Sequence, residues 1–337
     1  MPYGKIAVTF VSILCSARAA PQPGISGPYA HEGLSVFLIH RAAPAWTQGA
    51  IRASSVHYLT LEQAMIQKKV VVHETNQVNE LAVENVSADA VFIQGGDIVK
   101  GGNQDRMISN DFILAPHSGQ LPLSAFCVER GRWGRRGSES AQVFGVSTEL
   151  AAVRFDPKSL WGQASVWQFV RGLQEALASH LRKKPGVAGL ASVTALASPT
   201  SLLLTQTSPP VQETVDAYTK PLAGAIQGTT DVVGYAFAVD GELRSADLYA
   251  SPALFYSMWP KLLKSSAVET VRLGRRPKAS RVDGSEVMAF LRGTNGVPET
   301  TIGVGDRTKL VKRDTTSQLH LESRDGSTWV HWSVVKK

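Results

Sequence analysis

Val70-Val71-Val72-His73-Glu74 opens a series of short apolar segments that decides the fold class of this chain. Four further segments of β-branched or apolar residues follow, each bounded by turn residues, at positions 81–85, 90–93, 106–115 and 121–129. Such segments are typical of strands. Because no helical pattern separates them, they predict an antiparallel sandwich or barrel-like module. We expect this β-rich part to span residues 34–150.

The sequence changes character near residue 160, where apolar residues begin to recur at helical spacing. Helices are expected at 160–181, 211–226 and 252–264, with a strand at 232–239 that turns at Asp240-Gly241. Residues 151–271 are therefore expected to be mixed α/β, with a flexible excursion at 186–210 that is rich in Ala, Ser, Thr and Pro. Residues 272–337 are expected to form a C-terminal β extension. The predicted fold class is α+β.

A shorter helix is expected at residues 61–68, where Thr60 can cap the first turn. Its capping-box glutamate is not at the usual place.

The first nineteen residues carry the pattern of a secretory signal peptide. Lys5 precedes an apolar run at positions 6–15, and Ala17-Arg18-Ala19 supplies small residues at the two positions that a signal peptidase reads. Cleavage is expected after Ala19, followed by a linker at residues 20–33. The run is too short for a stable membrane anchor, although a buried N-terminal helix is the alternative. The protein is therefore expected to be exported, either periplasmic or extracellular.

Composition narrows the possible partners. The 337 residues carry a net charge of +7, but no long run of lysine and arginine appears. Nucleic-acid binding is therefore not expected. The eight histidines are scattered without HxH or HExxH spacing, so neither a metal site nor a cofactor is predicted.

Two charged motifs flank neighbouring strands and form the candidate site. In the first, at residues 95–106, paired glycines allow close backbone approach. If residues 104–106 are extended, Gln104 and Arg106 share one face and could clamp an anion or an amide. A hairpin with two bulged turns and an exposed ion pair is the alternative. The candidate ligand-binding residues of this motif are Gly96, Asp97, Lys100, Gln104, Asp105 and Arg106.

The second motif is Cys127-Val128-Glu129-Arg130-Gly131-Arg132-Trp133. Glu129 ends an apolar strand, so its carboxylate is expected to be half-buried and to need a cationic partner. Arg106, Arg130 and Arg132 are the candidates for that partner. Glu129, Arg132 and Trp133 complete the candidate ligand-binding residues. A structural arginine–carboxylate lock, with Trp133 in the core, is the alternative. Cys127 is expected to be a core thiol.

These two motifs, together with Gly234-Tyr235, Asp247-Leu248-Tyr249 and the segment 254–263, resemble the ARPP-1 domain family. The family name stands for "ARG and rhodanese-phosphatase-superfamily-associated protein". The resemblance covers roughly residues 34–271 and implies no established activity. The name implies genomic association with ADP-ribosylglycohydrolases.

The leading functional hypothesis is an exported protein that binds a small polar or anionic ligand. One alternative is a hydrolase or transferase in which Glu129 is the acid/base and Arg106 and Arg132 bind an anion. A structural or interaction role is a third possibility. A raised pKa of Glu129 would favour the enzyme.

Overall fold

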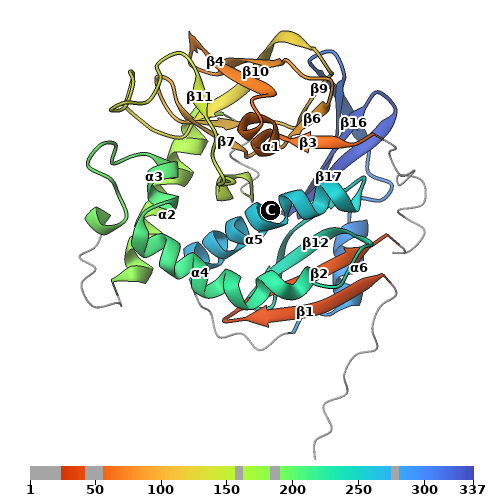
Figure 1. Ribbon diagram of the computed structural model, residues 1–337. Helices are drawn as coiled ribbons and strands as arrows, with labels where there is room; N and C mark the ends of the chain where they lie inside the picture. The colour runs from red at the N-terminus through yellow and green to blue at the C-terminus, as the bar shows by residue number, and fades with distance from the viewer. Residues whose placement is uncertain (1–23, 42–55, 156–161, 183–189, 275–280) are drawn as a thin grey trace, which may run out of the picture.

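The computed structural model describes residues 24–41, 56–155, 162–182, 190–274 and 281–337 (Figure 1). Within these ranges the protein is a β-rich mixture of strands and helices, arranged around three sheets. The expected α+β class is confirmed at this level.

The largest sheet has eight antiparallel strands in the order β1-β2-β12-β13-β17-β16-β15-β14. Their bounds are β1 (Ile25–His31), β2 (Leu34–His40), β12 (Val232–Val239), β13 (Glu242–Tyr249), β14 (Glu299–Val304), β15 (Thr308–Asp314), β16 (Gln318–Asp325) and β17 (Thr328–Lys336). Every residue of β12 is buried, as its continuous apolar sequence predicts. Gly234 is required there, because a Cβ atom would lie 2.4 Å from the carbonyl oxygen of Asp247 on β13.

Two smaller sheets form a second body. One has the order β11-β7-β8-β10-β5-β4 and the other the order β3-β6-β9. The bounds are β3 (Tyr58–Thr60), β4 (Val70–Gln77), β5 (Glu80–Asn85), β6 (Ala90–Ile93), β7 (Ile98–Gly101), β8 (Arg106–Ile108), β9 (Phe112–Leu114), β10 (Gly119–Cys127) and β11 (Phe144–Gly145). The two sheets share one hydrophobic core. The β3/β6 pair is parallel, so the expected module is not purely antiparallel.

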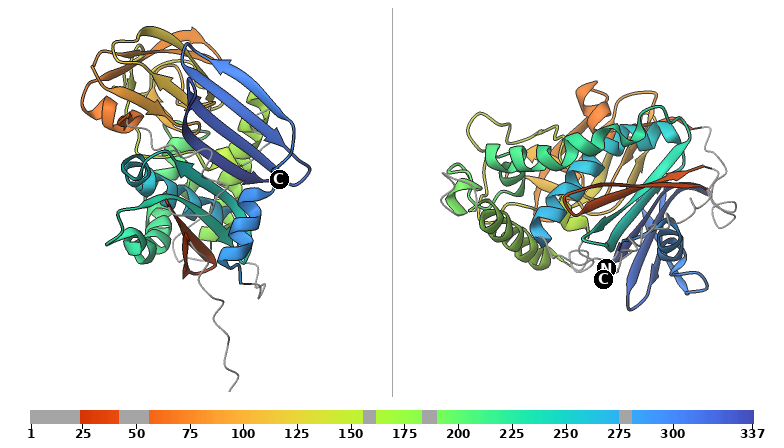
Figure 2. Two further views of the ribbon diagram at one scale, coloured as in Figure 1. Left: turned by 90° about the vertical axis from the view of Figure 1, so that its right-hand side faces the viewer. Right: turned by 90° about the horizontal axis from the view of Figure 1, so that it is seen from below.

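The α-helices are α1 (Leu61–Ile66), α2 (Gln163–Leu181), α3 (Leu202–Gln206), α4 (Pro209–Ala223), α5 (Pro252–Leu273) and α6 (Gly284–Arg292). Short 3-10 helices occupy Ala152–Phe155, Leu190–Ser192 and Gly224–Ile226. Helix α5 contacts both β12 of the large sheet and β3 of the second body, so it lies between them (Figure 1). The C-terminal strands β15–β17 lie beside the second body (Figure 2). One contact between them is the hydrogen bond that the hydroxyl of Tyr58 on β3 donates to Asp325 on β16 at 2.9 Å.

Two expected boundaries are wrong. Residues 25–31 of the expected linker form β1, an edge strand whose register shifts between Ser26 and Tyr29. An edge position tolerates Pro28, which cannot donate a backbone hydrogen bond. The expected C-terminal extension is not an appendage, since β17 pairs with β13 in the middle of the large sheet.

Two local expectations also need correction. The expected flexible excursion at 186–210 contains a 3-10 helix, the capped helix α3 and the start of α4. Helix α1 has a complete capping box, because Gln63 stands at the third helical position and bonds back to the Thr60 backbone. The expected signal peptide lies outside the described residues.

Candidate functional site

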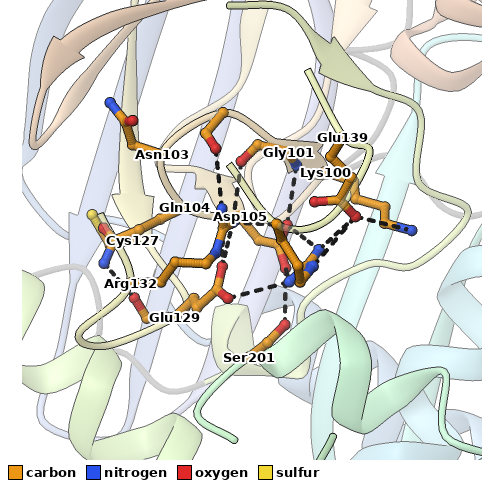
Figure 3. Close-up of polar contacts among 12 residues, drawn as sticks. Lys100, Gly101, Asn103, Gln104, Asp105, Cys127, Glu129, Arg132, Glu139 and Ser201 are labelled. Atoms are coloured by element: carbon orange, nitrogen blue, oxygen red, sulfur yellow. Dashed lines mark hydrogen bonds and ion pairs between the residues drawn. The ribbon is translucent and has the colours of Figure 1, made fainter. Parts of the chain in front are cut away.

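Strand pairing brings the two charged motifs together. Cys127 on β10 pairs with Arg106 on β8, so the residues that follow β10 run beside those that precede β8. The turn before β8 depends on Gly102, which has a φ of +53°. A Cβ atom there would lie 2.4 Å from the Phe144 ring and 2.7 Å from a carboxylate oxygen of Glu74. The result is a group of seven side chains, here called the arginine–carboxylate cluster: Glu74, Gln104, Asp105, Arg106, Glu129, Arg132 and Arg136. Five of them are buried residues, and the side chains of the other two, Glu74 and Arg132, are 2% and 12% exposed. Figure 3 labels Gln104, Asp105, Glu129 and Arg132 of this cluster.

Glu129 is completely buried rather than half-buried. It accepts hydrogen bonds from Arg132 Nη2 at 2.6 Å, from Arg136 Nη1 at 3.2 Å and from the Asp105 backbone N–H at 2.9 Å. Burial alone would raise the pKa of Glu129, but the hydrogen bonds from Arg132, Ser198 and the Asp105 backbone hold it below its ordinary value. The carboxylate therefore stays ionised at neutral pH.

Arg136 and Glu74 are the two members of the cluster that the sequence analysis did not place in the site. Its two terminal nitrogens each lie 3.0 Å from a carboxylate oxygen of Asp105, which is a bidentate contact. Asp105 also accepts from Ser201 Oγ at 2.8 Å and from the Gly101 backbone at 3.1 Å. Burial lowers the pKa of Arg136, but the contact with Asp105, the hydrogen bond to Glu139 and the charge of Glu129 together raise it above its ordinary value, so the cation is permanent.

Arg106 has a different partner from the one expected. Its Nη1 donates to Gln104 Oε1 at 2.9 Å, which confirms that these two side chains share a face. Its carboxylate neighbour is Glu74, at 3.7 Å from Nη2, rather than Glu129. Nη1 also donates to the thiol of Cys127 at 2.6 Å. Cys127 is buried, as expected for a core thiol.

The remaining candidates lie at or outside the edge of the cluster. Trp133 is 53% exposed and lies over Arg106, with 5.6 Å between the guanidinium carbon and the ring centroid. Lys100 pairs with Glu139 at 3.3 Å. Gly96 and Asp97 do not join this group, because Asp97 contacts Lys261 on α5 at 2.8 Å. The nine candidate residues therefore do not form one site.

The charges of the cluster compensate one another. Its three guanidinium groups are paired with the carboxylates of Glu74, Asp105 and Glu129, and Arg136 also bonds Glu139 at 3.0 Å. The hydrogen bonding is less complete, because Arg106 Nε, Arg106 Nη2 and Arg132 Nε are buried without a hydrogen-bond partner among the described residues. Because three guanidinium groups face three carboxylates, a further anion inside the cluster would be buried without a compensating charge.

A groove of about 790 Å³ lies immediately beside the cluster, between α2 and residues 190–200. Arg130 reaches it from the second motif and stacks on Trp167, with 5.7 Å between the guanidinium carbon and the ring centroid. Among the described residues, Arg130 has no carboxylate partner and the Trp167 indole nitrogen has no hydrogen-bond acceptor. Other lining residues include Gln168, Arg171, Gln174, Thr194, Pro199 and Thr200. Glu175 also lines the groove, and its carboxylate is paired with Arg171 at 3.0 Å. Arg130 is therefore the lining cation to which a ligand in the groove can offer an acceptor.

A second charged network, also missed from the sequence, lies between the two bodies. Asp247 on β13 accepts from Arg154 at 3.0 and 3.1 Å. His331 on β17 lies between Asp111, at 2.7 Å, and Asp247, at 3.2 Å. Burial lowers the pKa of His331, but the two carboxylates outweigh this effect and raise the pKa to about 9. Burial raises the pKa of Asp247, but Arg154 and His331 outweigh this effect and lower the pKa to about 2.

Two surveys of the described residues bear on cofactors and membranes. No group of three or more His, Cys, Asp or Glu side chains there is arranged to hold a metal ion. No helix in that part of the chain is long and apolar enough to cross a membrane.

Comparison with known proteins gives one match. Residues 22–335 match the family described as the ARG and Rhodanese-Phosphatase-superfamily-associated Protein domain. The match extends beyond the expected limits of 34–271 and includes β1 and the C-terminal strands, in agreement with their place in the large sheet. No curated protein and no solved structure matches the chain. The chain belongs to the ARPP-1 family over nearly its whole length.

Proposed function

We propose that the protein binds a small anionic or polar ligand in the groove between α2 and residues 190–200. The observation that carries the proposal is the Arg130–Trp167 pair: a guanidinium without a carboxylate partner among the described residues lies on the ring of an indole that lines the groove. An acceptor stabilises such a guanidinium, and an anion in the groove supplies one to Arg130. The volume of about 790 Å³ is in the range of small-molecule sites.

The arginine–carboxylate cluster supports this proposal by fixing one wall of the groove. Thr200 Oγ1 donates to the Arg130 carbonyl at 2.6 Å, and the Leu202 backbone N–H donates to Val128 at 2.9 Å. Ser201 is bound to Asp105 inside the cluster. The wall residues Pro199 and Thr200 are therefore held in place before a ligand arrives, which lowers the entropic cost of binding.

The enzymatic alternative receives less support. A general acid at neutral pH needs a raised pKa, whereas the pKa of Glu129 is lowered by its hydrogen bonds. The Glu129 carboxylate also accepts hydrogen bonds from Arg132, Arg136 and the Asp105 backbone already. These contacts favour a structural role for Glu129 beside the proposed binding groove.

A ligand screen tests the proposal. Phosphate, nucleotides, ADP-ribose, amino acids and neutral sugars are compared by thermal shift, since a ligand that binds only the folded protein raises the melting temperature. We expect stabilisation by an anionic member of the set. Arg130→Gln should weaken that ligand about 10- to 100-fold in calorimetry, because a hydrogen bond to a charged group contributes roughly 1.5–3 kcal/mol.

Arg292→Gln is the matched control. Arg292 is an exposed arginine in the last turn of α6, outside the groove, so its loss should leave ligand affinity unchanged. Equal weakening by both substitutions would indicate a general effect of net charge. An affinity unchanged in Arg130→Gln would remove the groove from consideration.

We also propose that the protein is exported, on the basis of Lys5, the apolar run at 6–15 and Ala17-Arg18-Ala19. The mature chain is expected to begin at Ala20. Mass spectrometry of protein purified from its natural cells measures the N-terminus directly. A chain that retains Met1 or begins at Pro2 would contradict the proposal.

A further inference from the structure

A lysine that the proposed function does not use is buried in the middle of helix α5. Lys261 is 4% exposed, and most of the residues around it on the helix are buried as well. Its Nζ lies 2.8 Å from Oδ1 of Asp97, a residue that is 1% exposed and immediately precedes β7. A primary amine and a carboxyl group therefore meet inside the protein, where an ion pair carries a desolvation cost.

A second carboxylate lies beside the same amine. Oε2 of Glu62, in the first turn of α1, is 3.4 Å from Lys261 Nζ. The Glu62 side chain is 25% exposed, whereas the Asp97 side chain is 1% exposed. One cation thus faces two carboxylates, of which only Glu62 reaches solvent. Asp97 alone would neutralise the ammonium, so Glu62 is free to exchange a proton with it.

The Asp97 carboxyl group is held in place opposite the amine. Its Oδ2 accepts the backbone N–H of Gln94 at 3.0 Å. Its own backbone N–H donates to the Gln94 carbonyl at 2.9 Å, and its carbonyl accepts the N–H of Ile108 at 2.8 Å. Because Cγ is bonded to Oδ1, Lys261 Nζ starts close to the carbon that it would attack, as a near-attack arrangement requires.

We propose that Lys261 and Asp97 condense to an intramolecular amide bond, with Glu62 as the proton carrier of the reaction. The bond would join residues 164 positions apart and attach α5 to the second body. Cys127 is the only cysteine in the described part of the chain, so no disulfide provides a covalent link there. The proposal is independent of the groove at Arg130.

The reaction can be written with all its atoms. Burial lowers the pKa of Lys261, but Asp97 and Glu62 raise it above its ordinary value, so the resting amine is an ammonium. One proton passes along the hydrogen bond from Nζ to Oδ1, which leaves a neutral amine beside a carboxylic acid. Nζ then attacks Cγ, and the negative charge that develops on Oδ2 is stabilised by the Gln94 N–H.

The second half of the reaction releases water. Glu62 takes a second proton from Nζ and delivers it to the Oδ1 hydroxyl, the bond from Cγ to Oδ1 breaks, and Oδ1 leaves as water. The positive charge of Lys261 and the negative charge of Asp97 cancel, and no oxidant or other reactant is consumed.

Placement of the groups by the fold favours this condensation. Two well-oriented groups react as though one were present at about 10⁵–10⁸ M, which offsets the stability of the separate ions in water. The product also replaces a buried ion pair by a neutral amide, so the desolvation cost of two charges is removed.

Mass spectrometry of the purified full-length protein tests the proposal. Lys261→Arg keeps the positive charge, but a guanidinium is always protonated and does not attack a carboxyl group. The wild type should therefore be lighter than this variant by the mass difference of the two side chains plus one water molecule. A tryptic digest of the wild type should contain the peptide with Asp97 joined to the peptide with Lys261, uncleaved after Lys261.

Two further variants separate this reaction from a structural ion pair. Glu62→Gln keeps the amine, Asp97 and the capping box of α1, yet it should slow the condensation by about 10²–10⁴-fold, the usual contribution of a positioned acid/base. Lys264→Arg is the matched control on the same helix. Lys264 pairs with Glu149 at 3.1 Å, and its replacement should leave the cross-link complete.

Three results would contradict the proposal. A folded wild type that has the full mass of its sequence would overturn it, as would a loss of water that persists in Lys261→Arg. A Glu62→Gln protein that is cross-linked as fully and as fast as the wild type would remove Glu62 from the reaction.

Discussion

Replacing Arg136 by methionine is expected to lower the free energy of unfolding by about 3–5 kcal/mol. The guanidinium makes the bidentate contact with Asp105 and a further bond to Glu129 at 3.2 Å, and both carboxylates are fully buried. Methionine preserves much of the side-chain volume and removes the charge. Asp105 then remains buried without its principal cation, and this uncompensated charge is the source of the loss. Urea unfolding followed by tryptophan fluorescence measures it.

Two comparisons make the result specific to the cluster. Arg171→Met removes an exposed arginine, 79% exposed on its side chain and paired with Glu175 at 3.0 Å, and should cost less than about 1 kcal/mol. Glu129→Gln should lower the free energy of unfolding by less in the Arg136→Met background than in the wild type, because Glu129 and Arg136 interact with each other. The free energy of unfolding of Arg136→Met could instead lie within about 1 kcal/mol of the wild-type value. That result would mean that water reaches the cluster, and Glu129 would again be a candidate acid/base.

The local elements could be predicted because their signals lie within a few residues. The helix expected at 160–181 is described from Gln163 to Leu181, and the Asp240-Gly241 turn joins β12 to β13 as its sequence indicates. Long-range pairing has no such signal. Val36 of β2 pairs with Phe237 of β12 across two hundred residues of sequence. The linker and C-terminal extension were therefore misplaced, since nothing local shows that their strands join one sheet.

The candidate site shows the same division. The alternation of an extended chain correctly placed Gln104 and Arg106 on one face. It could not place Arg136, because the loop after β10 has no period from which a side-chain direction can be read. Asp97 was grouped with its sequence neighbours, whereas its partner Lys261 lies on α5, more than 160 residues away.

Buried polar residues within apolar strands were an unused signal. Asp247 lies in β13 and His331 in β17, each among buried neighbours. A charged group at such a position needs a partner, and the strands that bear these two residues pair with each other. The sequence alone thus contained evidence for a second network, although it did not name Arg154 or Asp111 as members.

The stability of the protein should fall above neutral pH because of His331. Its pKa is about 9 in the folded protein and about 6.5 in an unfolded chain. The folded state therefore binds the proton more tightly, and the stabilisation is fully present below about pH 6.5 and disappears as the pH rises through 9. The difference in pKa corresponds to roughly 3 kcal/mol. His331→Gln should be less stable than the wild type near pH 6 and approach it near pH 9.5.

His320 provides a control of opposite sign. Burial, together with Arg313, lowers its pKa to about 4, so its contribution is present above about pH 6.5 and is lost as the pH falls towards 4. Asp247, with a pKa of about 2, adds a further loss only below about pH 4. The stability maximum should therefore lie near pH 6.5, with its alkaline side set by His331 and its acidic side by His320.

Urea unfolding between pH 4 and 9.5 measures the contributions of His331 and His320 separately. His331→Gln should flatten only the alkaline side, and a variant whose stability runs parallel to the wild type over pH 6.5–9.5 would show that the imidazolium between Asp111 and Asp247 does not stabilise the fold.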